Sequence, residues 1–524
     1  MNWIANSDTI IFGPEFNAEL DIELISAYAK LIFSNYMMND NLFESYENNN
    51  LNEQEFSENK FNQDVSNLPP SLTHLIFGCN FNQDVSALPH SLTYLIFGYY
   101  FNQDVKSLPQ GITYLSFGCE FNRDVSNLPH SLTCLFFGHN FNQDISSLPQ
   151  GITYLTFGNR FNQDVSVLPS TLTHLTFGLD FNQDVSILPP NLKYLIFNYS
   201  FNQDVSVLPP TLTHLTFGNR FNQDVSVLPP TLTHLTFGSD FNQDVSSLPS
   251  TLTHLTFGFD FNQDVSVLPS TLTHLTFGNW FDKDILKLPQ TITHLIFGSN
   301  FNRDVSNLPH NLTHLTFDYA FNKDASNLPQ GLTHLIFGNQ FNKDVSSLPQ
   351  TLTHLIFGKL FNRDVSSLPQ TLTMIKFGDY FSQDISNLPP LLTHLILGYY
   401  FEQKNNILPN VKYLKLNCNN QDMVDNLPNS IVELELGILF DCKINNLPTS
   451  IKKLKINAQS RYDMDLNCLP DFIEELHLNN SYKKRILHIP LNLKKLVCFE
   501  NYPYKDDFIS SHIKTCFIKY SIMK

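Results

Sequence analysis

The 524-residue chain has few charged residues, and it lacks the long apolar stretch of a membrane protein. Asp, Glu, Lys and Arg together make up 15% of the chain, against about a quarter in an ordinary globular protein. No apolar run is long enough to span a bilayer, and the first residues, MNWIANSD, do not resemble a signal peptide. We therefore expect an intracellular, cytoplasmic protein without membrane association.

The cysteines form no recognisable pattern. Neither a CxxC pair nor a regular spacing connects the eight residues, which are Cys79, Cys119, Cys134, Cys418, Cys442, Cys468, Cys498 and Cys516. This distribution argues against a disulfide framework and against a zinc cluster. We expect free thiols in a reducing compartment and no bound metal or other cofactor.

The chain also lacks a basic surplus and catalytic motifs. Its net charge is −17, which argues against a nucleic-acid partner. The acidic surplus lies in residues 1–400, whereas residues 401–524 hold 17 basic and 14 acidic residues. A P-loop, a dinucleotide fingerprint and an HExxH motif are all absent. Because an active site needs different residues that converge at one place, we predict no catalytic residue and no enzyme activity.

A repeat of twenty residues fills most of the chain. The stretch FNQDVSVLPPTLTHLTFGNR at residues 201–220 recurs with variations in seventeen copies from residue 61 to residue 400. We number the positions of each copy 1 to 20 from the Phe of FN. Phe at position 1, Asp at position 4 and Leu-Pro at positions 8 and 9 occur in every copy. A fixed period of this length predicts a solenoid.

The repeat becomes irregular at both ends. Residues 1–60 contain two degenerate strand segments, TIIFGPEFNAEL and AKLIFSNY, followed by a loop expected at 37–60. In residues 401–524 the coils continue with unequal lengths, and Lys404 stands where position 4 should be Asp. Because terminal coils must not expose their stacking face, we interpret both regions as caps. A basic docking surface for an acidic partner is the competing interpretation of the C-terminal lysines, which are Lys412, Lys415, Lys452, Lys453, Lys455, Lys494 and Lys495.

The pattern within one copy predicts a short strand and an extended return. THLTF, at positions 13–17, is rich in β-branched and aromatic residues. Alternation places the Leu at position 15 and the Phe at position 17 in the core, and positions 14 and 16 on the exposed face. Identical coils would stack with strands ~4.8 Å apart. The predicted fold is mostly β, a single elongated solenoid resembling the leucine-rich repeat, with a parallel sheet and about 20 residues per coil.

The repeat resembles two known patterns. LTHLTF followed by LP resembles the core of short leucine-rich repeats, and FNQDVSVLPPTLTHLTFG resembles more specifically the FNIP repeat family of social amoebae and amoeba-infecting giant viruses. This resemblance implies a repeat scaffold, in the cytoplasm of the host cell if the chain is viral. The copies here are a couple of residues shorter between FN and LP than is usual in the family. Some relatives carry an F-box, but residues 1–60 show no such motif.

Two polar ladders are candidate sites. Aspartates at position 4 either bind calcium between coils or accept backbone hydrogen bonds within their own turn, and we favour the second alternative. Asn at position 2 is expected to bond its turn and the next coil. Neighbouring carboxylates about 5 Å apart would otherwise repel by about 1 kcal/mol even in water. The structural ladder residues that we single out are Asp64, Asp84, Asp224, Asp244, Asn202 and Asn222.

A second ladder follows position 14. His occupies this position in eight consecutive copies, and Tyr replaces it in others. Imidazoles on adjacent strands could bind a metal, but Tyr is a poor zinc ligand and favours simple stacking of rings. The variable positions 19 and 20 carry exposed aromatic residues that are typical of protein interfaces, although drift at a solvated turn explains them equally well. The candidate partner-binding residues are His214, His234, His254, His274, His294, His314, His334, His354, Tyr94, Tyr114, Tyr154, Trp280 and Tyr400.

These observations predict a non-catalytic scaffold for protein–protein interaction through the exposed strand face. The alternative is the substrate-recognition component of a ubiquitin-ligase-type complex, in which the N-terminal segment would recruit the other components. We expect a monomer that binds a protein partner whose identity the sequence does not reveal.

Overall fold

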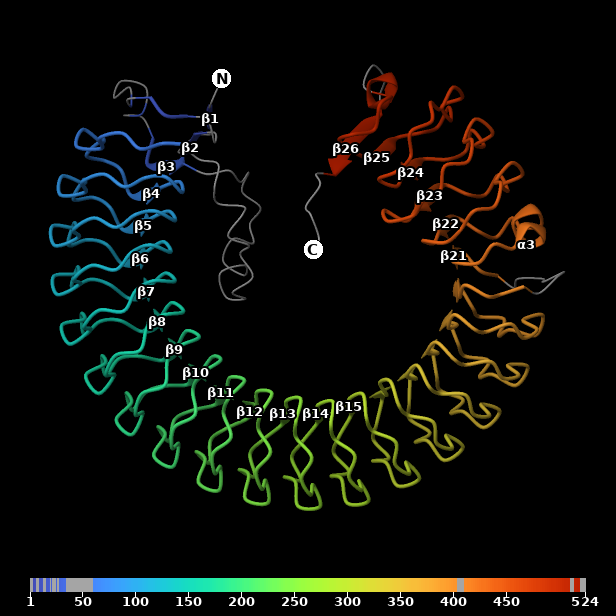
Figure 1. The fold of residues 1–524 in the computed structure, drawn as a ribbon, viewed down its shortest axis with the longest axis horizontal. Coiled ribbons are helices and arrows are strands. Elements are labelled where there is room, and N and C mark those ends of the chain that lie inside the picture. The colour runs from blue at the N-terminus through green and yellow to red at the C-terminus, as the bar shows by residue number, and fades with distance from the viewer. Residues whose placement is uncertain are drawn as a thin grey trace. The chain divides into compact units, whose positions relative to one another are not determined.

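Short coils of the same kind make up two compact units, Met1–Gln263 and Asp264–Lys524 (Figure 1). The computed structural model describes residues 3–5, 9–12, 16–18, 20, 25, 28–33, 60–402, 410–508 and 513–518. Of the loop expected at 37–60, residues 37–59 lie outside these residues, and so does Lys404.

Each coil of the first unit contributes one short strand. In chain order the strands of this unit are β1 (Trp3–Ala5), β2 (Thr9–Phe12), β3 (Lys30–Phe33), β4 (His74–Ile76), β5 (Tyr94–Ile96), β6 (Tyr114–Ser116), β7 (Cys134–Phe136), β8 (Tyr154–Thr156), β9 (His174–Thr176), β10 (Tyr194–Ile196), β11 (His214–Thr216), β12 (His234–Thr236) and β13 (His254–Thr256). Neighbouring strands from β2 onward pair in parallel, and β1 pairs antiparallel with β2.

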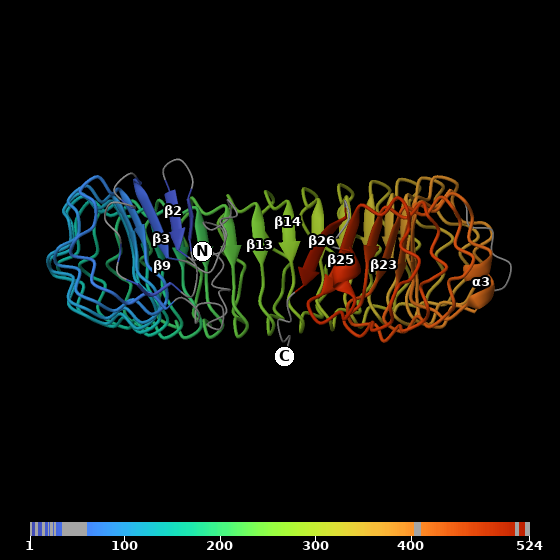
Figure 2. The same cartoon turned by 90° about the horizontal axis from the view of Figure 1, so that it is seen from above.

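The second unit follows the same plan. Its strands are β14 (His274–Thr276), β15 (His294–Ile296), β16 (His314–Thr316), β17 (His334–Ile336), β18 (His354–Ile356), β19 (Met374–Lys376), β20 (His394–Leu397), β21 (Tyr413–Leu416), β22 (Glu433–Leu436), β23 (Lys453–Ile456), β24 (Glu475–His477), β25 (Lys495–Phe499) and β26 (Lys514–Ile518). A short helix, α3 (Gln421–Asp425), and a 3₁₀ turn (Lys505–Phe508) lie in the C-terminal coils. Neighbouring strands are parallel, as Figure 2 shows for β23, β25 and β26.

The predicted fold class, a mostly β parallel solenoid with about twenty residues per coil, is confirmed. The regular strands are shorter than expected and cover positions 14–16 rather than 13–17. The flanking positions still take part in the ladder. Thr233 donates its N–H to the carbonyl of Thr213 at 2.9 Å, and Phe237 donates to the carbonyl of Thr256 at 2.9 Å.

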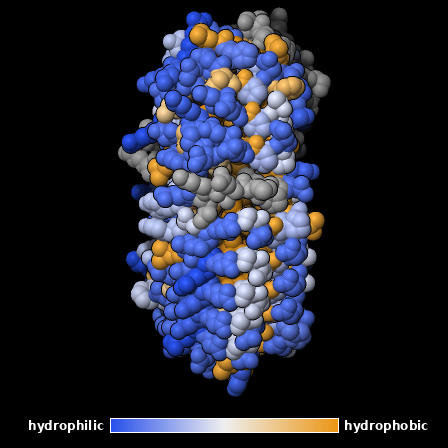
Figure 3. Space-filling view, turned by 90° about the vertical axis from the view of Figure 1, so that its right-hand side faces the viewer, coloured by the Kyte–Doolittle hydropathy of each residue, from blue (hydrophilic) through white to orange (hydrophobic). Residues whose placement is uncertain are grey.

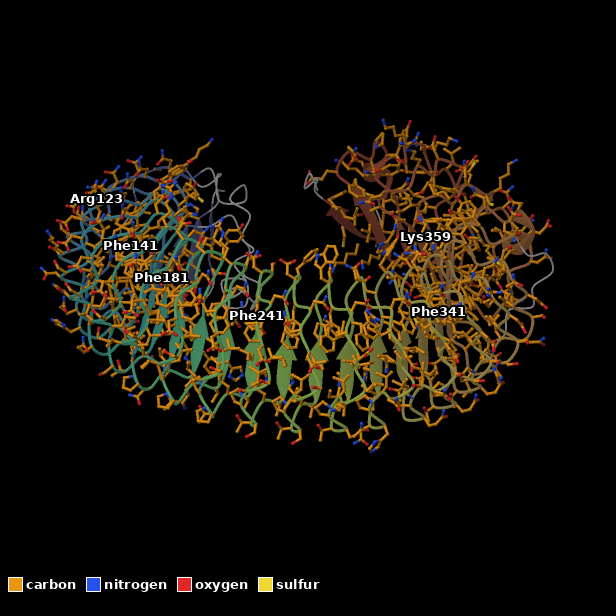
Figure 4. All side chains as sticks on the ribbon, turned by 60° about the horizontal axis from the view of Figure 1, so that its bottom comes forward. Arg123, Phe141, Phe181, Phe241, Phe341 and Lys359 are labelled. Atoms are coloured by element: carbon orange, nitrogen blue, oxygen red, sulfur yellow. The ribbon has the colours of Figure 1, made fainter. Side chains whose placement is uncertain are left out.

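The core lies inside each coil, between the strand and the return. In the coil 221–240, the Phe, Val and Leu side chains at positions 1, 5, 8, 12, 15 and 17 are buried. The phase of the strand is therefore predicted correctly, and His234 and His274 lie outside the core. Phe141, Phe181 and Phe241 of the first unit lie inside their coils (Figure 4).

The spacing of the ring ladders explains why strands line the inner side of each curved unit (Figure 1). On the strand face, the rings of His214 and His234 lie 4.2 Å apart. The buried rings of Phe217 and Phe237 are 5.7 Å apart, and those of the position-1 residues Phe221 and Phe241 are 6.1 Å apart. Each coil is therefore narrower at its strand than at its bulky aromatic core, and stacking such wedges produces curvature.

Glycine at position 18 permits the close approach of successive coils. A Cβ atom at Gly258 would lie 1.7 Å from the carbonyl oxygen of Gly238. Backbone occupies the space that a side chain would need, so most copies have Gly here. Asn198 is an exception, and its side-chain amide donates to the carbonyl of Phe177 at 2.8 Å.

Candidate functional site

The strand face of the regular coils carries a column of stacked rings. In the second unit, successive imidazoles from His274 to His354 lie 4.2–4.3 Å apart with ring planes 11–12° from parallel. The three imidazoles of His214, His234 and His254 stack in the same way in the first unit. We expected these side chains to be exposed, but they are only half-exposed, because each ring covers the faces of its neighbours.

Tyrosine continues this column where histidine is absent. The rings of Tyr94 and Tyr114 lie 4.3 Å apart, and the ring of Tyr194 stacks between His174 and His214 at 4.3 Å from each. The rings meet face to face along the column, so only their edges are available to another molecule. The face can thus offer hydrogen-bonding groups and ring edges, but little flat aromatic surface.

One break in the column is repaired from a position that sequence reasoning did not single out. Cys134 replaces the ring at position 14 in β7. Phe136, at position 16 of the same strand, lies between the rings of Tyr114 and Tyr154 at 5.2 and 5.4 Å, with its ring plane tilted by 35–36° from theirs. The signal was present, because the one Phe at position 16 occurs in the one copy with Cys at position 14. A second break, at Met374, has no such replacement ring in its strand.

The preceding threonine holds each imidazole. The hydroxyl of Thr313 lies 2.9 Å from Nδ1 of His314 and donates to the carbonyl of Thr293 at 3.1 Å. Burial lowers the pKa of His314, and the neighbouring imidazole of His294 lowers it further. Two charges at this spacing would repel by about 1 kcal/mol even in water, so the column favours neutral rings.

The column is poorly arranged for metal chelation. Nearly parallel rings direct their in-plane lone pairs in parallel, whereas ligands of one ion must converge on it. Within the residues that the structure describes, no group of three or more His, Cys, Asp or Glu side chains could hold a metal ion.

The aspartates at position 4 accept hydrogen bonds from their own turn, as predicted. Asp224 accepts from the backbone N–H of Ser226 at 2.9 Å and from its hydroxyl at 2.8 Å. Asp64, Asp84 and Asp244 make the same pair of bonds in their turns. These turns lie on the exposed return. The backbone and hydroxyl bonds from Ser206 lower the pKa of Asp204, so such carboxylates stay charged at neutral pH.

The asparagines at position 2 connect one coil to the next. Oδ1 of Asn202 accepts from the backbone N–H of Asn222 at 3.0 Å and from the amide of Gln223 at 3.1 Å. Asn222 binds Asn242 and Gln243 in the same way. The predicted bond to the next coil is thereby confirmed.

The side chains at positions 19 and 20 lie in the turn after the strand. Trp280 and Tyr400 are 54% and 55% exposed. Tyr380 stacks on Tyr400 with ring centroids 4.9 Å apart, and the guanidinium of Arg220 lies 5.1 Å from the ring of Tyr199. The backbone here is fixed, since Arg220 donates its N–H to the carbonyl of Tyr199 at 2.9 Å. Exposed aromatic residues are therefore presented on a rigid turn.

The C-terminal coils replace the ring column with alternating charges. Across β22 to β25 the position-14 row reads Glu433, Lys453, Glu475 and Lys495, and each residue faces its neighbour in register. The ammonium of Lys453 lies 3.7 Å from Glu433 and 3.6 Å from Glu475, while Lys495 lies 2.9 Å from Glu475. Burial alone would raise the pKa of Glu475, but the bonds from His477 and Lys495 lower it to about 2.

The adjacent row alternates in the same way. Lys415 donates to Glu435 at 2.5 Å, and Tyr413 donates its hydroxyl to the same carboxylate at 2.9 Å. Lys455 stands opposite Glu435 in this row and lies 2.8 Å from Glu433 of the first row. Sequence reasoning identified the lysines but missed that glutamates stand between them. These strands do not form a uniformly basic surface, which weakens the docking interpretation of these lysines.

A family model and a solved structure at 32% identity match most of the chain. The model described as FNIP Repeat matches ten overlapping segments that together span residues 61–400. The solved structure is CroV588, described as a novel circular LRR protein; it is 32% identical, with a TM-score of 0.72, and the match covers 99% of this chain and all of that one.

Other solved structures match at lower identity. YopM from Yersinia enterocolitica is 18% identical over 88% of this chain and 98% of that chain, with a TM-score of 0.40. InlJ from Listeria monocytogenes is 18% identical over 62% of this chain and 68% of that chain, with a TM-score of 0.38. A comparison with curated proteins gives no match. None of the helices in the described ranges could cross a membrane.

Proposed function

Because the chain belongs to the FNIP repeat family, whose coils build a leucine-rich-repeat-like scaffold, we propose that it is a non-catalytic protein that binds a protein partner through its strand face and the adjoining turns. The observation that supports this most is the contrast between positions. The repeated polar residues at positions 2 and 4 are engaged in hydrogen bonds within or between coils. The residues at positions 19 and 20 differ from coil to coil.

These variable residues have the chemistry of an interface. Tyr100, Phe259, Tyr319 and Tyr380 are between 44% and 50% exposed, in addition to Trp280 and Tyr400. Aromatic residues are enriched at protein interfaces, and a rigid backbone reduces the entropy lost on binding. By contrast, the outer face of the second unit is mostly hydrophilic (Figure 3).

The N-terminal region also favours the scaffold hypothesis over the hypothesis of a ligase component. β2 and β3 pair in parallel with each other, and β3 pairs with β4. These segments continue the sheet as degenerate coils, whereas a recruiting module would need its own fold.

The test is capture of a partner from native or infected cells with the full chain as bait. A variant with Trp280→Ser, Tyr319→Ser, Tyr380→Ser and Tyr400→Ser should lose the specific partner. A matched control, with Ser306→Ala, Ser346→Ala and Ser366→Ala in the exposed return, should retain it. Retention by the aromatic variant, or loss by the control alone, would contradict the proposed surface.

A further inference from the structure

A comparison of coils with and without histidine at position 14 identifies the tautomer of the neutral imidazoles. Where position 14 is not histidine, the preceding threonine hydroxyl still donates to the carbonyl one coil before, at 3.3 Å for Thr93 and 3.1 Å for Thr373. Where histidine follows, that bond is equally short, 3.1 Å for Thr333 and Thr353. A hydroxyl has one proton to donate. Since the carbonyl receives it, the imidazole supplies the proton of the Nδ1–hydroxyl contact.

Nε2 is then the unprotonated nitrogen of each neutral imidazole. In His294, His314, His334 and His354, Nδ1 lies 2.9 Å from a threonine hydroxyl, and Nε2 makes no hydrogen bond within the described part of the chain. All four imidazoles are partly exposed. Acidification can therefore add a proton at Nε2 without breaking the threonine contact.

We propose that this column is an acid-gated binding surface, which presents a row of neutral acceptors at neutral pH and binds acidic polypeptide segments once the imidazoles are protonated. This inference rests on the proposed role of the strand face in binding. The charge of the second unit favours it, since that unit holds 25 Lys and Arg against 24 Asp and Glu. Protonation of the column would make this nearly neutral unit cationic on one face.

Among the groups around the column, the imidazoles are the ones that respond to acidification. The charges that act on His334 are the neighbouring imidazoles of His294, His314 and His354. Beyond His354, β19 places Met374 beside the column and Lys376 at position 16. The aspartates at position 4 lie in the return, whereas Asp318 and Asp379 follow β16 and β19 in the turn after the strand.

The position-4 aspartates with a lowered pKa also stay ionised over the range in which histidine titrates. The hydroxyl and backbone bonds from Ser306 lower the pKa of Asp304, and those from Ser346 lower the pKa of Asp344. A fixed basic stripe at position 3 is the competing anion site, and it contains Lys283, Arg303, Lys323, Lys343 and Arg363. Its charge does not change between neutral and mildly acidic pH, so the two sites can be separated.

The experiment measures binding of a fluorescein-labelled oligoaspartate peptide by anisotropy at about pH 7.5 and about pH 5. The full chain should bind at least about tenfold more tightly at the lower pH. The variant H294Y/H314Y/H334Y/H354Y should lose most of this gain, because it removes four of the five imidazoles of the second unit's column while Tyr preserves the stack, as at Tyr94 and Tyr114. The control R303Q/K323Q/K343Q should keep the gain.

Equal affinity of the full chain at both pH values would overturn the proposal, as would an unchanged gain in the four-tyrosine variant. Loss of the gain in the control alone would assign the anion site to the return. Partner capture at neutral pH reports on the proposed function independently. A partner bound there through the strand face without any acid-dependent anion binding would refute the gate and leave the function standing.

Discussion

Within the second unit, the regular coils repeat histidine along the position-14 row of the strand face, whereas the C-terminal coils alternate Glu and Lys along that row. The row from His274 to His354 contains five imidazoles. The corresponding row further along the same unit reads Glu433, Lys453, Glu475 and Lys495. In both regions neighbouring strands are parallel and in register.

The difference shows what a repeating sequence can place on a stacked face. Identical coils put like beside like, so a charged residue there would face its own charge at close range. Neutral rings avoid this cost and gain stacking contacts. Alternating charges are also stable, but they require neighbouring coils to differ, so the regular period is lost wherever they occur.

Removing the alternating region should have the largest effect. Truncation after residue 400 would expose the edge of β20, which now pairs with β21 over four residues, including Leu395 and Leu397. An exposed strand edge promotes edge-to-edge association. Light scattering should show oligomers of the truncated chain, whereas the full chain stays monomeric. A truncated chain that is monomeric and as stable as the full chain would contradict the assignment of residues 401–524 as a cap.

Breaking the alternation should cost less. Glu435→Lys would place an ammonium between Lys415 and Lys455 on a partly buried face. We expect a loss of about 2 kcal/mol in the free energy of unfolding, between the values for exposed and buried pairs. Thr316→Lys, at the same position between the neutral Ile296 and Ile336, should change stability by less than about 0.5 kcal/mol. Equal losses in urea denaturation would show that the alternation does not matter.

Substitutions in the return should sharpen the contrast between the Asn and Asp ladders. Asn222→Ala removes a partly buried acceptor for Asn242 and Gln243 and should cost about 1 kcal/mol. Asp224→Ala should cost less, because its serine donors are exposed and water replaces the carboxylate. Urea denaturation of both variants measures which substitution causes the larger loss of stability. A larger loss for the Asp variant would mean that its turn is strained without the carboxylate.

A change of pH should have the smallest effect on stability. It should act on the histidine column and on the glutamate ladder in different pH ranges. The pKa values of His294, His314 and His334 are lowered on folding, so the unfolded chain binds more protons and stability falls as the pH drops below 6.5. The four-tyrosine variant should lose this dependence in thermal melts. The glutamate ladder should weaken only as the pH falls from 4.5 towards the pKa of about 2 of Glu475. Identical melts of both chains between neutral pH and pH 5 would contradict the lowered histidine pKa values.

Much of the fold was predictable because the period fixes the register. Once Leu235 and Phe237 are assigned to the core, His234 must lie on the opposite face, and its stacking on His254 follows from the repeat. The partial burial of the imidazoles was not predictable, because it depends on the distance of 4.2 Å between ring centroids, which is shorter than the usual strand separation of about 4.8 Å. The alternating Glu and Lys residues are present in the sequence, but unequal coil lengths obscure which of them face each other.

In-register stacking at a separation of twenty residues is the central claim, and a cysteine already in the column tests it directly. Cys134 lies opposite Tyr154 on the neighbouring strand, and adjacent strands bring Cα atoms within the range of a disulfide. Mild oxidation of Tyr154→Cys should link residues 134 and 154, as detected by peptide mass spectrometry. Leu155→Cys, which points into the core, should not link to Cys134. A link in the Leu155 variant, or none in the Tyr154 variant, would contradict the register.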